Sequence, residues 1–206
     1  MIADIKSPDT AIVRQAEELV RSASSSMLYN HVMRCYWFAE LYAQKEQSKA
    51  DRELIFLSAA LHDLGFTELG KGPSRFEIEG AHAARTFLKK NGVPEDRAWQ
   101  AWSTIALHTW DINLYKEDEA RLTEFGILYD VIGFPVTLDQ ADVAEVVRRY
   151  PRLGFKKNFY DLLRDDANKP DYPHRFHVCT CIANETPGAI QIPNARTLLN
   201  GAPFPE

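Results

Sequence analysis

The stretch Leu54-Ile-Phe-Leu-Ser-Ala-Ala-Leu-His-Asp63 contains the longest apolar run of the chain, interrupted only by Ser58. A helix that is apolar on most sides belongs in the middle of a fold, so the run predicts a central helix over residues 51–64, ended by Gly65. The helix carries His62 and Asp63 into this apolar setting. A buried charge is unfavourable unless it is paired or binds a metal. The ordinary alternative for an isolated His-Asp pair is a capping aspartate beside a histidine that bonds to the backbone.

Asp130 repeats this pattern further along the chain. It is the only charged residue in Gly126-Ile-Leu-Tyr-Asp-Val-Ile-Gly-Phe134, and it lies mid-helix, where aspartate has a poor propensity. No Lys or Arg lies within a helical turn of it, and an unpaired carboxylate in such surroundings would become neutral. The sequence therefore predicts that something cationic faces Asp130.

Two histidines, His31 and His108, also interrupt apolar helical stripes. Each alone is best explained as a hydrogen-bonded core residue. Together with His62, Asp63 and Asp130, however, they predict one inward-facing cluster. Imidazole and carboxylate side chains on facing helices are the usual way in which a helical bundle builds a metal site.

The fold class that we predict is all-α, because apolar residues recur at steps of three and four and no strand is strongly signalled. We predict a single domain over residues 1–206, with a core over about 26–167 and a Pro-rich tail over 170–206. The tail is expected to wrap the surface or a partner subunit of a homo-oligomer. The predicted helices are 7–22, 26–46, 51–64, 77–90, 95–108, 117–132, 139–150 and 156–167.

Composition narrows the function classes. The 206 residues are 45% hydrophobic and 26% charged, with a net charge of −5 and no cluster of basic residues. This balance fits a globular protein and disfavours a nucleic-acid groove. No apolar run is long enough to span a bilayer, and no signal peptide is recognised, so we expect a cytoplasmic chain without membrane contact. Its three cysteines are treated as structural or incidental.

The order His31, His62-Asp63 and Asp130 resembles the signature of HD-domain metal-dependent hydrolases, and within them the cyanamide hydratase-like branch. The resemblance implies a core of five or six helices. It covers most of residues 28–165. The matching stretches are residues 57–65 (LSAALHDLG), 75–88 (RFEIEGAHAARTFL), 105–108 (IALH), 126–133 (GILYDVIG) and 150–159 (YPRLGFKKNF).

What the resemblance implies is one divalent metal held by His31, His62, Asp63 and Asp130, with His108 facing the same cavity. In cyanamide hydratases the metal is zinc, and its acidified water attacks a nitrile carbon to give urea. Mn²⁺, Co²⁺ or a pair of iron ions are the alternatives. The proton acceptor is left open. Asp63 itself can serve, and the carboxylates Glu68, Glu77 and Asp111 are further candidates in the substrate pocket.

Two positions depart from the hydratase pattern. His82, between the dyad and His108, also suits a dinuclear arrangement with a second metal, as in di-iron oxygenases; a solvent-facing helix residue is the alternative. Phe66 stands where many HD phosphohydrolases carry a lysine, and this favours a small neutral substrate. The leading hypothesis is therefore a metal-dependent hydratase or hydrolase. The rivals are a phosphohydrolase acting on nucleotides or small phosphate esters, a di-iron oxygenase and a non-catalytic ligand-binding module.

Overall fold

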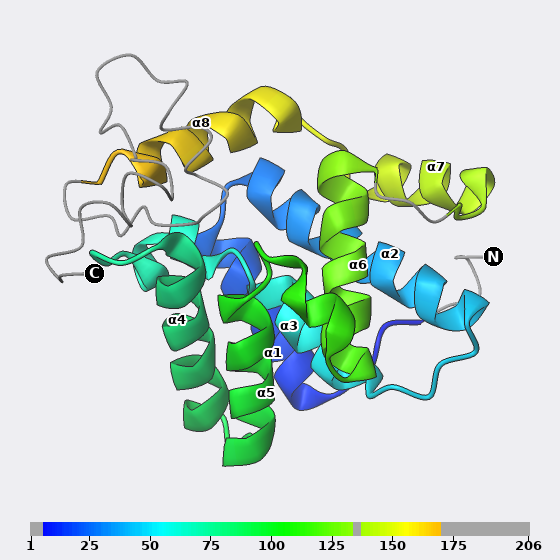
Figure 1. Cartoon of the computed structure of the whole chain (residues 1–206), viewed down its shortest axis with the longest axis horizontal. Helices are drawn as coiled ribbons and strands as arrows, with labels where there is room; N and C mark the ends of the chain where they lie inside the picture. The colour runs from blue at the N-terminus through cyan, green and yellow to red at the C-terminus, as the bar shows by residue number, and fades with distance from the viewer. Residues whose placement is uncertain (1–5, 134–136, 170–206) are drawn as a thin grey trace, which may run out of the picture.

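The computed structural model describes residues 6–133 and 137–169, and this part of the chain is built from helices without strands (Figure 1). The all-α prediction is confirmed, and each predicted helix has a counterpart. The helices are α1 (Ala11–Ala23), α2 (Ser26–Lys45), α3 (Arg52–Leu61), α4 (Phe76–Lys90), α5 (Glu95–Ala106), α6 (Asp118–Ile132), α7 (Gln140–Arg149) and α8 (Phe155–Ala167).

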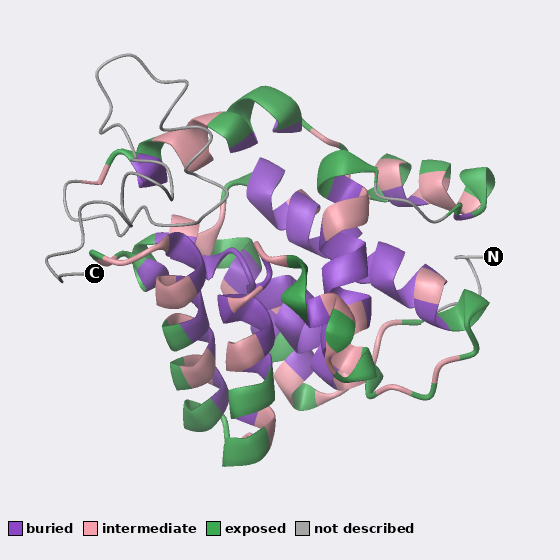
Figure 2. Cartoon of the chain, in the orientation of Figure 1, coloured by how far each residue is buried: buried purple, intermediate pink, exposed green. Residues whose placement is uncertain are grey.

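Helix α3 lies at the centre, and all its residues from Leu54 to Leu61 are buried (Figure 2). It begins at the Asp51 cap, whose carboxylate accepts hydrogen bonds from two backbone amides of the first turn. It ends at Leu61, earlier than predicted, and a short 3₁₀ helix over Leu64–Phe66 follows the dyad. Gly65 does not end α3. Its lack of a side chain is needed because a Cβ atom there would overlap the carbonyl group of Phe76, at the start of α4.

Helices α2 and α6 pack closely against each other (Figure 1). The two backbones come close at Gly126, where a Cβ atom would overlap the carbonyl oxygen of Cys35. Asp130 lies about one turn beyond Gly126, and His31 lies about one turn before Cys35. This glycine contact therefore brings the carboxylate of one helix next to the imidazole of the other.

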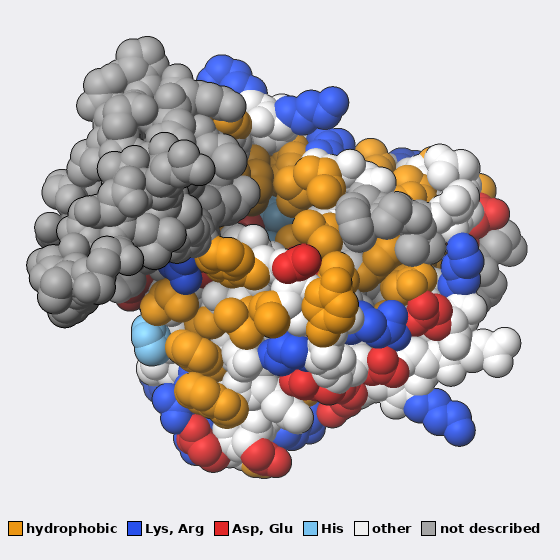
Figure 3. Space-filling model, in the orientation of Figure 1, with side chains coloured by type: hydrophobic (Ala, Val, Ile, Leu, Met, Phe, Trp, Pro, Cys, Tyr) orange, Lys and Arg blue, Asp and Glu red, His pale blue; other side chains and the backbone are white. Residues whose placement is uncertain are grey.

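The first helix begins later than predicted. Ala11 starts α1, and the Thr10 hydroxyl accepts the hydrogen bond of the Val13 amide as the cap. Among the described helices, none is long and apolar enough to cross a membrane. On the face shown in Figure 3, basic and acidic side chains are interspersed. The predicted tail over 170–206 lies outside the described residues.

Candidate metal centre

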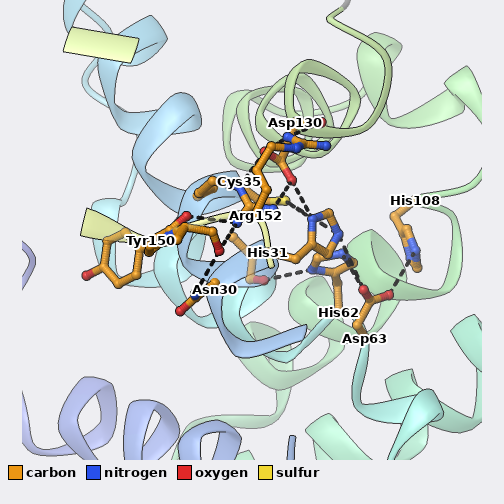
Figure 4. Close-up of polar contacts among 12 residues, drawn as sticks. Asn30, His31, Cys35, His62, Asp63, His108, Asp130, Tyr150 and Arg152 are labelled. Atoms are coloured by element: carbon orange, nitrogen blue, oxygen red, sulfur yellow. Dashed lines mark hydrogen bonds and ion pairs between the residues drawn. The ribbon is translucent and has the colours of Figure 1, made fainter. Parts of the chain in front are cut away.

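Three histidines surround the carboxylate of Asp63 (Figure 4). The Nε2 atoms of His31 and His62 each lie 3.4 Å from Asp63 Oδ2, and His108 Nε2 lies 3.9 Å from Asp63 Oδ1. His31 comes from α2, the His62-Asp63 dyad follows α3, and His108 follows α5. The cluster is shielded from solvent, because each of the four residues is at most 5% exposed.

The ends of two helices orient two of these rings. The last carbonyl groups of a helix lack partners within it. His62 Nδ1 donates to the Ala59 carbonyl at 2.8 Å, and His108 Nδ1 donates to the Ile105 carbonyl at 2.6 Å. Helix α5 ends at Ala106, so the predicted extension of this helix through His108 is wrong. The hydrogen bond from histidine to the backbone that was expected as the ordinary alternative is thus present. It uses only one nitrogen, Nδ1, of each ring.

Burial keeps the His62 and His108 rings neutral. It lowers the pKa of His62 to about 3, with the His31 ring acting in the same direction, and it lowers the pKa of His108 to about 4. With the proton on Nδ1, the Nε2 lone pairs of both rings are free to bind a metal. Burial also raises the pKa of the Asp63 carboxyl.

The unused polar atoms of the cluster fit a divalent cation. His62 Nε2 and both Asp63 oxygens are buried without a hydrogen-bond partner among the described residues. Such atoms are unfavourable unless an ion or a water molecule satisfies them. His62, Asp63 and His108 lie close enough to share one ion. Cys35 lies near His31 and His62, but burial raises the pKa of its thiol and disfavours the thiolate that a metal requires.

The structure does not place Asp130 among the donor atoms around Asp63. Its Oδ2 atom accepts a hydrogen bond from His31 Nδ1 at 2.7 Å, which turns His31 Nε2 toward Asp63. The cation that the sequence required is supplied by Arg34 of α2 and Arg152, which follows α7. Arg34 Nε lies 2.7 Å and Arg152 Nη1 lies 2.9 Å from Asp130 Oδ1. Burial alone would raise the pKa of Asp130, but the bonds from His31 and Arg34 lower it.

Three other predicted residues are not among the side chains that meet at Asp63. His82 is exposed on α4, where its Nδ1 accepts a hydrogen bond from Trp102 Nε1 at 3.2 Å. Glu68 is exposed on the surface and pairs with Lys71. Phe66 stacks behind Phe76, with ring centres 4.1 Å apart. The solvent-facing alternative therefore describes His82. Of the two stacked rings, Phe76 and not Phe66 lines the cavity beside the cluster.

A cavity of about 240 Å³ opens beside this cluster. Its walls are mostly apolar, and no Lys or Arg is present among the described residues that line it. Asp111, one of the candidate carboxylates, lines this cavity and is exposed. The lining residues are His31, His62, Phe76, His108, Thr109, Trp110, Asp111, Glu124, Ile127, Leu128, Val131, Ile132, Phe159 and Leu163.

Glu77 is fully buried in the first turn of α4. Its Oε1 atom accepts a hydrogen bond from Thr109 at 3.3 Å and lies 3.3 Å from Arg75 Nε. Burial dominates the pKa values of both Asp63 and His108, and the negative charge of Glu77 adds a smaller upward contribution at each. Of the predicted pocket carboxylates, Glu77 is thus the one whose charge acts on two residues of the cluster.

Sequence reasoning missed Glu124, which is buried in α6 and lines the same cavity. The signal was present, because Glu124 stands in an apolar helix just before the window in which Asp130 was noticed. Arg34 and Arg152 were also missed. Neither is near Asp130 in the sequence, and only the packing of α2 against α6 and the path of the chain after α7 bring them together.

Comparison with known proteins agrees with this geometry. The HD domain family model matches residues 28–132, which include His31, the dyad, His108 and Asp130. No curated protein matches the chain. HD domains generally belong to metal-dependent hydrolases. Since the match covers half of the chain and includes the clustered residues, the chain belongs to the HD domain family.

Proposed function

We propose that the chain is a metal-dependent hydratase or hydrolase that acts on a small uncharged molecule, as cyanamide hydratase does. The observation that carries the proposal is the position of the donor cluster. Three imidazole Nε2 atoms face the unpartnered carboxylate of Asp63, and the three histidines border an apolar cavity.

His31, His62, Asp63 and His108 are the ligands that we propose, with Asp130 orienting His31. A carboxylate that accepts the Nδ1 proton of a ligand histidine fixes the ring and makes its other nitrogen a better donor. Neutral imidazoles with one carboxylate suit Zn²⁺ well, and Mn²⁺ or Co²⁺ are the alternatives. Such a cation would acidify a water molecule and so supply a nucleophile at neutral pH.

The proton of that nucleophile requires an acceptor. Asp63 borders the centre, and Glu77 is linked electrostatically to both Asp63 and His108. Glu68 is exposed and pairs with Lys71, so it does not support this role. We therefore propose Asp63 or Glu77 as the proton acceptor. A Glu77→Gln variant that binds metal but loses turnover would assign the step to Glu77.

The cavity supports a neutral substrate over a phosphate ester. Phosphoryl transfer requires positive charge directed at the phosphate oxygens. The described lining residues include the acidic Asp111 and Glu124 and no basic side chain. The di-iron alternative loses support because His82, its second-metal ligand, is exposed and bonded to Trp102.

The test combines metal analysis with a substrate panel. We expect about one zinc ion per chain and conversion of cyanamide to urea by the zinc-loaded protein. Nucleoside monophosphates and p-nitrophenyl phosphate, assayed with zinc, manganese and cobalt, are the comparison substrates. Turnover of a nucleotide without turnover of cyanamide or other nitriles would overturn the proposal in favour of a phosphohydrolase. Two irons per chain would favour the oxygenase.

A further inference from the structure

Glu124 is a second buried carboxyl group on the wall of the cavity. Its side chain is 1% exposed, and it lines the same space as His31, His62 and His108. It belongs to α6, whereas the proposed metal ligands come from α2 and from the turns after α3 and α5. Neither the proposed metal binding nor the proposed proton acceptor uses this residue.

One oxygen of Glu124 is fixed and the other is free. Asn113 Nδ2 donates to Glu124 Oε2 at 3.2 Å and to the Thr104 carbonyl at 2.8 Å. These two bonds hold the amide group of Asn113 and, through it, the carboxyl of Glu124. Glu124 Oε1 is buried and has no hydrogen-bond partner among the described residues. A buried polar atom without a partner, on a residue that lines a cavity, is suited to contact a ligand.

The surroundings of Glu124 favour its uncharged form. A buried carboxylate requires a cationic partner to remain ionised. Within the described part of the chain, Glu124 receives one hydrogen bond, from a neutral amide, and pairs with no Lys or Arg. Burial raises its pKa to about 9, with the negative charge of Asp111 acting in the same direction, although the bond from Asn113 opposes the shift.

We propose that Glu124 binds the substrate as an uncharged carboxylic acid and selects small neutral nitrogen compounds of the nitrile, amide or urea type. The hydroxyl at Oε1 both donates and accepts a hydrogen bond, so it matches a nitrile nitrogen, an amide oxygen or an amino group. An anion gains no cationic contact from this wall. A cation would require Glu124 to ionise while buried. This inference rests on the proposed function, since it places the substrate of that reaction in this cavity.

Two substitutions test whether Glu124 binds the substrate as an uncharged acid or as a carboxylate. Glu124→Gln keeps the shape of the side chain and a neutral group that can donate or accept. Glu124→Met keeps a similar length but removes both capacities. Glu117→Gln is the matched control, because Glu117 is exposed and immediately precedes the same helix. Binding of cyanamide, acetamide, acetamidinium and inorganic phosphate to the zinc-loaded protein is measured by calorimetry, with zinc content and helicity determined for every variant.

We expect the wild type to bind cyanamide and acetamide in preference to the two charged probes. Glu124→Met should weaken binding of the neutral probes by about tenfold at unchanged zinc content. The affinity of Glu124→Gln for the neutral probes should remain within about threefold of the wild-type affinity, because the amide group keeps the hydrogen bond. The infrared band of a protonated carboxylic acid should be present at neutral pH in the wild type and in Glu117→Gln, and weaker in Glu124→Gln.

Each contrary result has its own meaning. Equal loss of binding in both Glu124 variants would show that the ionised form is needed and would overturn the proposal. Wild-type binding in Glu124→Met, or no binding of a neutral probe to the zinc-loaded wild type, would remove Glu124 from substrate recognition. Binding of neutral probes that depends on Glu124 but occurs without urea formation would instead contradict the proposed reaction and leave the role of Glu124 in place.

Discussion

His31 Nδ1 lies 2.7 Å from Asp130 Oδ2, although 99 positions separate the two residues in the chain. This hydrogen bond joins α2 to α6 and directs the other ring nitrogen of His31 toward Asp63. On its far side, the Asp130 carboxylate accepts hydrogen bonds from Arg34 and Arg152. Asp130 therefore links the geometry of the proposed metal centre to the packing of the bundle.

Replacing Asp130 by asparagine should reduce both stability and metal binding. The variant leaves the buried guanidinium of Arg34 without its counter-ion, and such a loss costs about 3–5 kcal/mol. It also replaces one carboxylate oxygen by an amide NH₂ group, which cannot accept, so the side chain can no longer serve His31, Arg34 and Arg152 together. A 10–100-fold loss of metal affinity is typical when such a partner of a ligand histidine is altered. Urea unfolding of the metal-free protein and competition with a zinc chelator measure the two effects separately.

The matched control for this substitution is Asp118→Asn on the same helix. Asp118 is exposed and pairs with Arg121 at the surface, so its loss should change stability by less than about 1 kcal/mol. If Asp130→Asn were as stable as this control, the carboxylate would not be balancing a buried charge.

Gly126→Ala should destabilise the protein, contrary to the usual effect of this change in a helix. Alanine normally favours a helix over glycine by about 1 kcal/mol. Here the added methyl group would overlap the Cys35 carbonyl, and overpacking of this kind costs about 1–3 kcal/mol. Because α6 must move away from α2, zinc affinity should fall together with the melting temperature. A more stable variant with normal zinc affinity would show that the two helices are not in close contact.

His108 and His82 provide a paired test of the metal centre. His108→Gln removes a buried Nε2 atom beside Asp63, so zinc affinity should fall at least about tenfold. His82→Gln alters an exposed side chain bonded to Trp102 and should retain about one zinc per chain. Metal content by mass spectrometry after dialysis distinguishes the two. Loss of one of two bound metals in the His82 variant would establish a dinuclear site.

The sequence predicted the helices well because their apolar periodicity is a local property. It also identified His31, His62, Asp63 and His108, because each is a polar residue in an otherwise apolar stripe. Helix ends were predicted less well. The chain leaves α3 after Leu61 and α5 after Ala106, and the histidines then bond to carbonyl groups of the last turn.

What the sequence could not predict was which polar groups meet. For Asp130 the sequence predicted a cationic partner, and the family resemblance implied a metal ion; no basic residue lies within a helical turn of Asp130. Its partners Arg34 and Arg152 come from α2 and from the segment after α7, and their approach depends on tertiary packing. Lys71 and Glu68 likewise pair on the surface, so proximity to the dyad in sequence does not place Glu68 in the cavity.

The pH dependence of stability should reveal the buried acid. Glu124 has a pKa of about 9 in the folded protein, against 4.5 for an ordinary glutamate, with burial as the main cause. Between these two values the folded state holds a proton that the unfolded state has released. A group that binds more protons in the folded state makes stability fall as pH rises. Above the ordinary pKa, the contribution of Glu124 to stability should therefore decline continuously until the pH passes about 9.

Comparison with Glu124→Gln isolates this contribution, because the shifted pKa values of His62 and His108 are common to both proteins. The free energy of unfolding of the metal-free proteins is measured in urea at pH 5, 6, 7 and 8. The wild type should lose stability relative to Glu124→Gln at every step, by up to about 1.4 kcal/mol per pH unit. The stability difference between the wild type and Glu117→Gln should stay constant, because Glu117 is exposed. A difference between the wild type and Glu124→Gln that does not change with pH would mean that Glu124 is ionised in the folded protein.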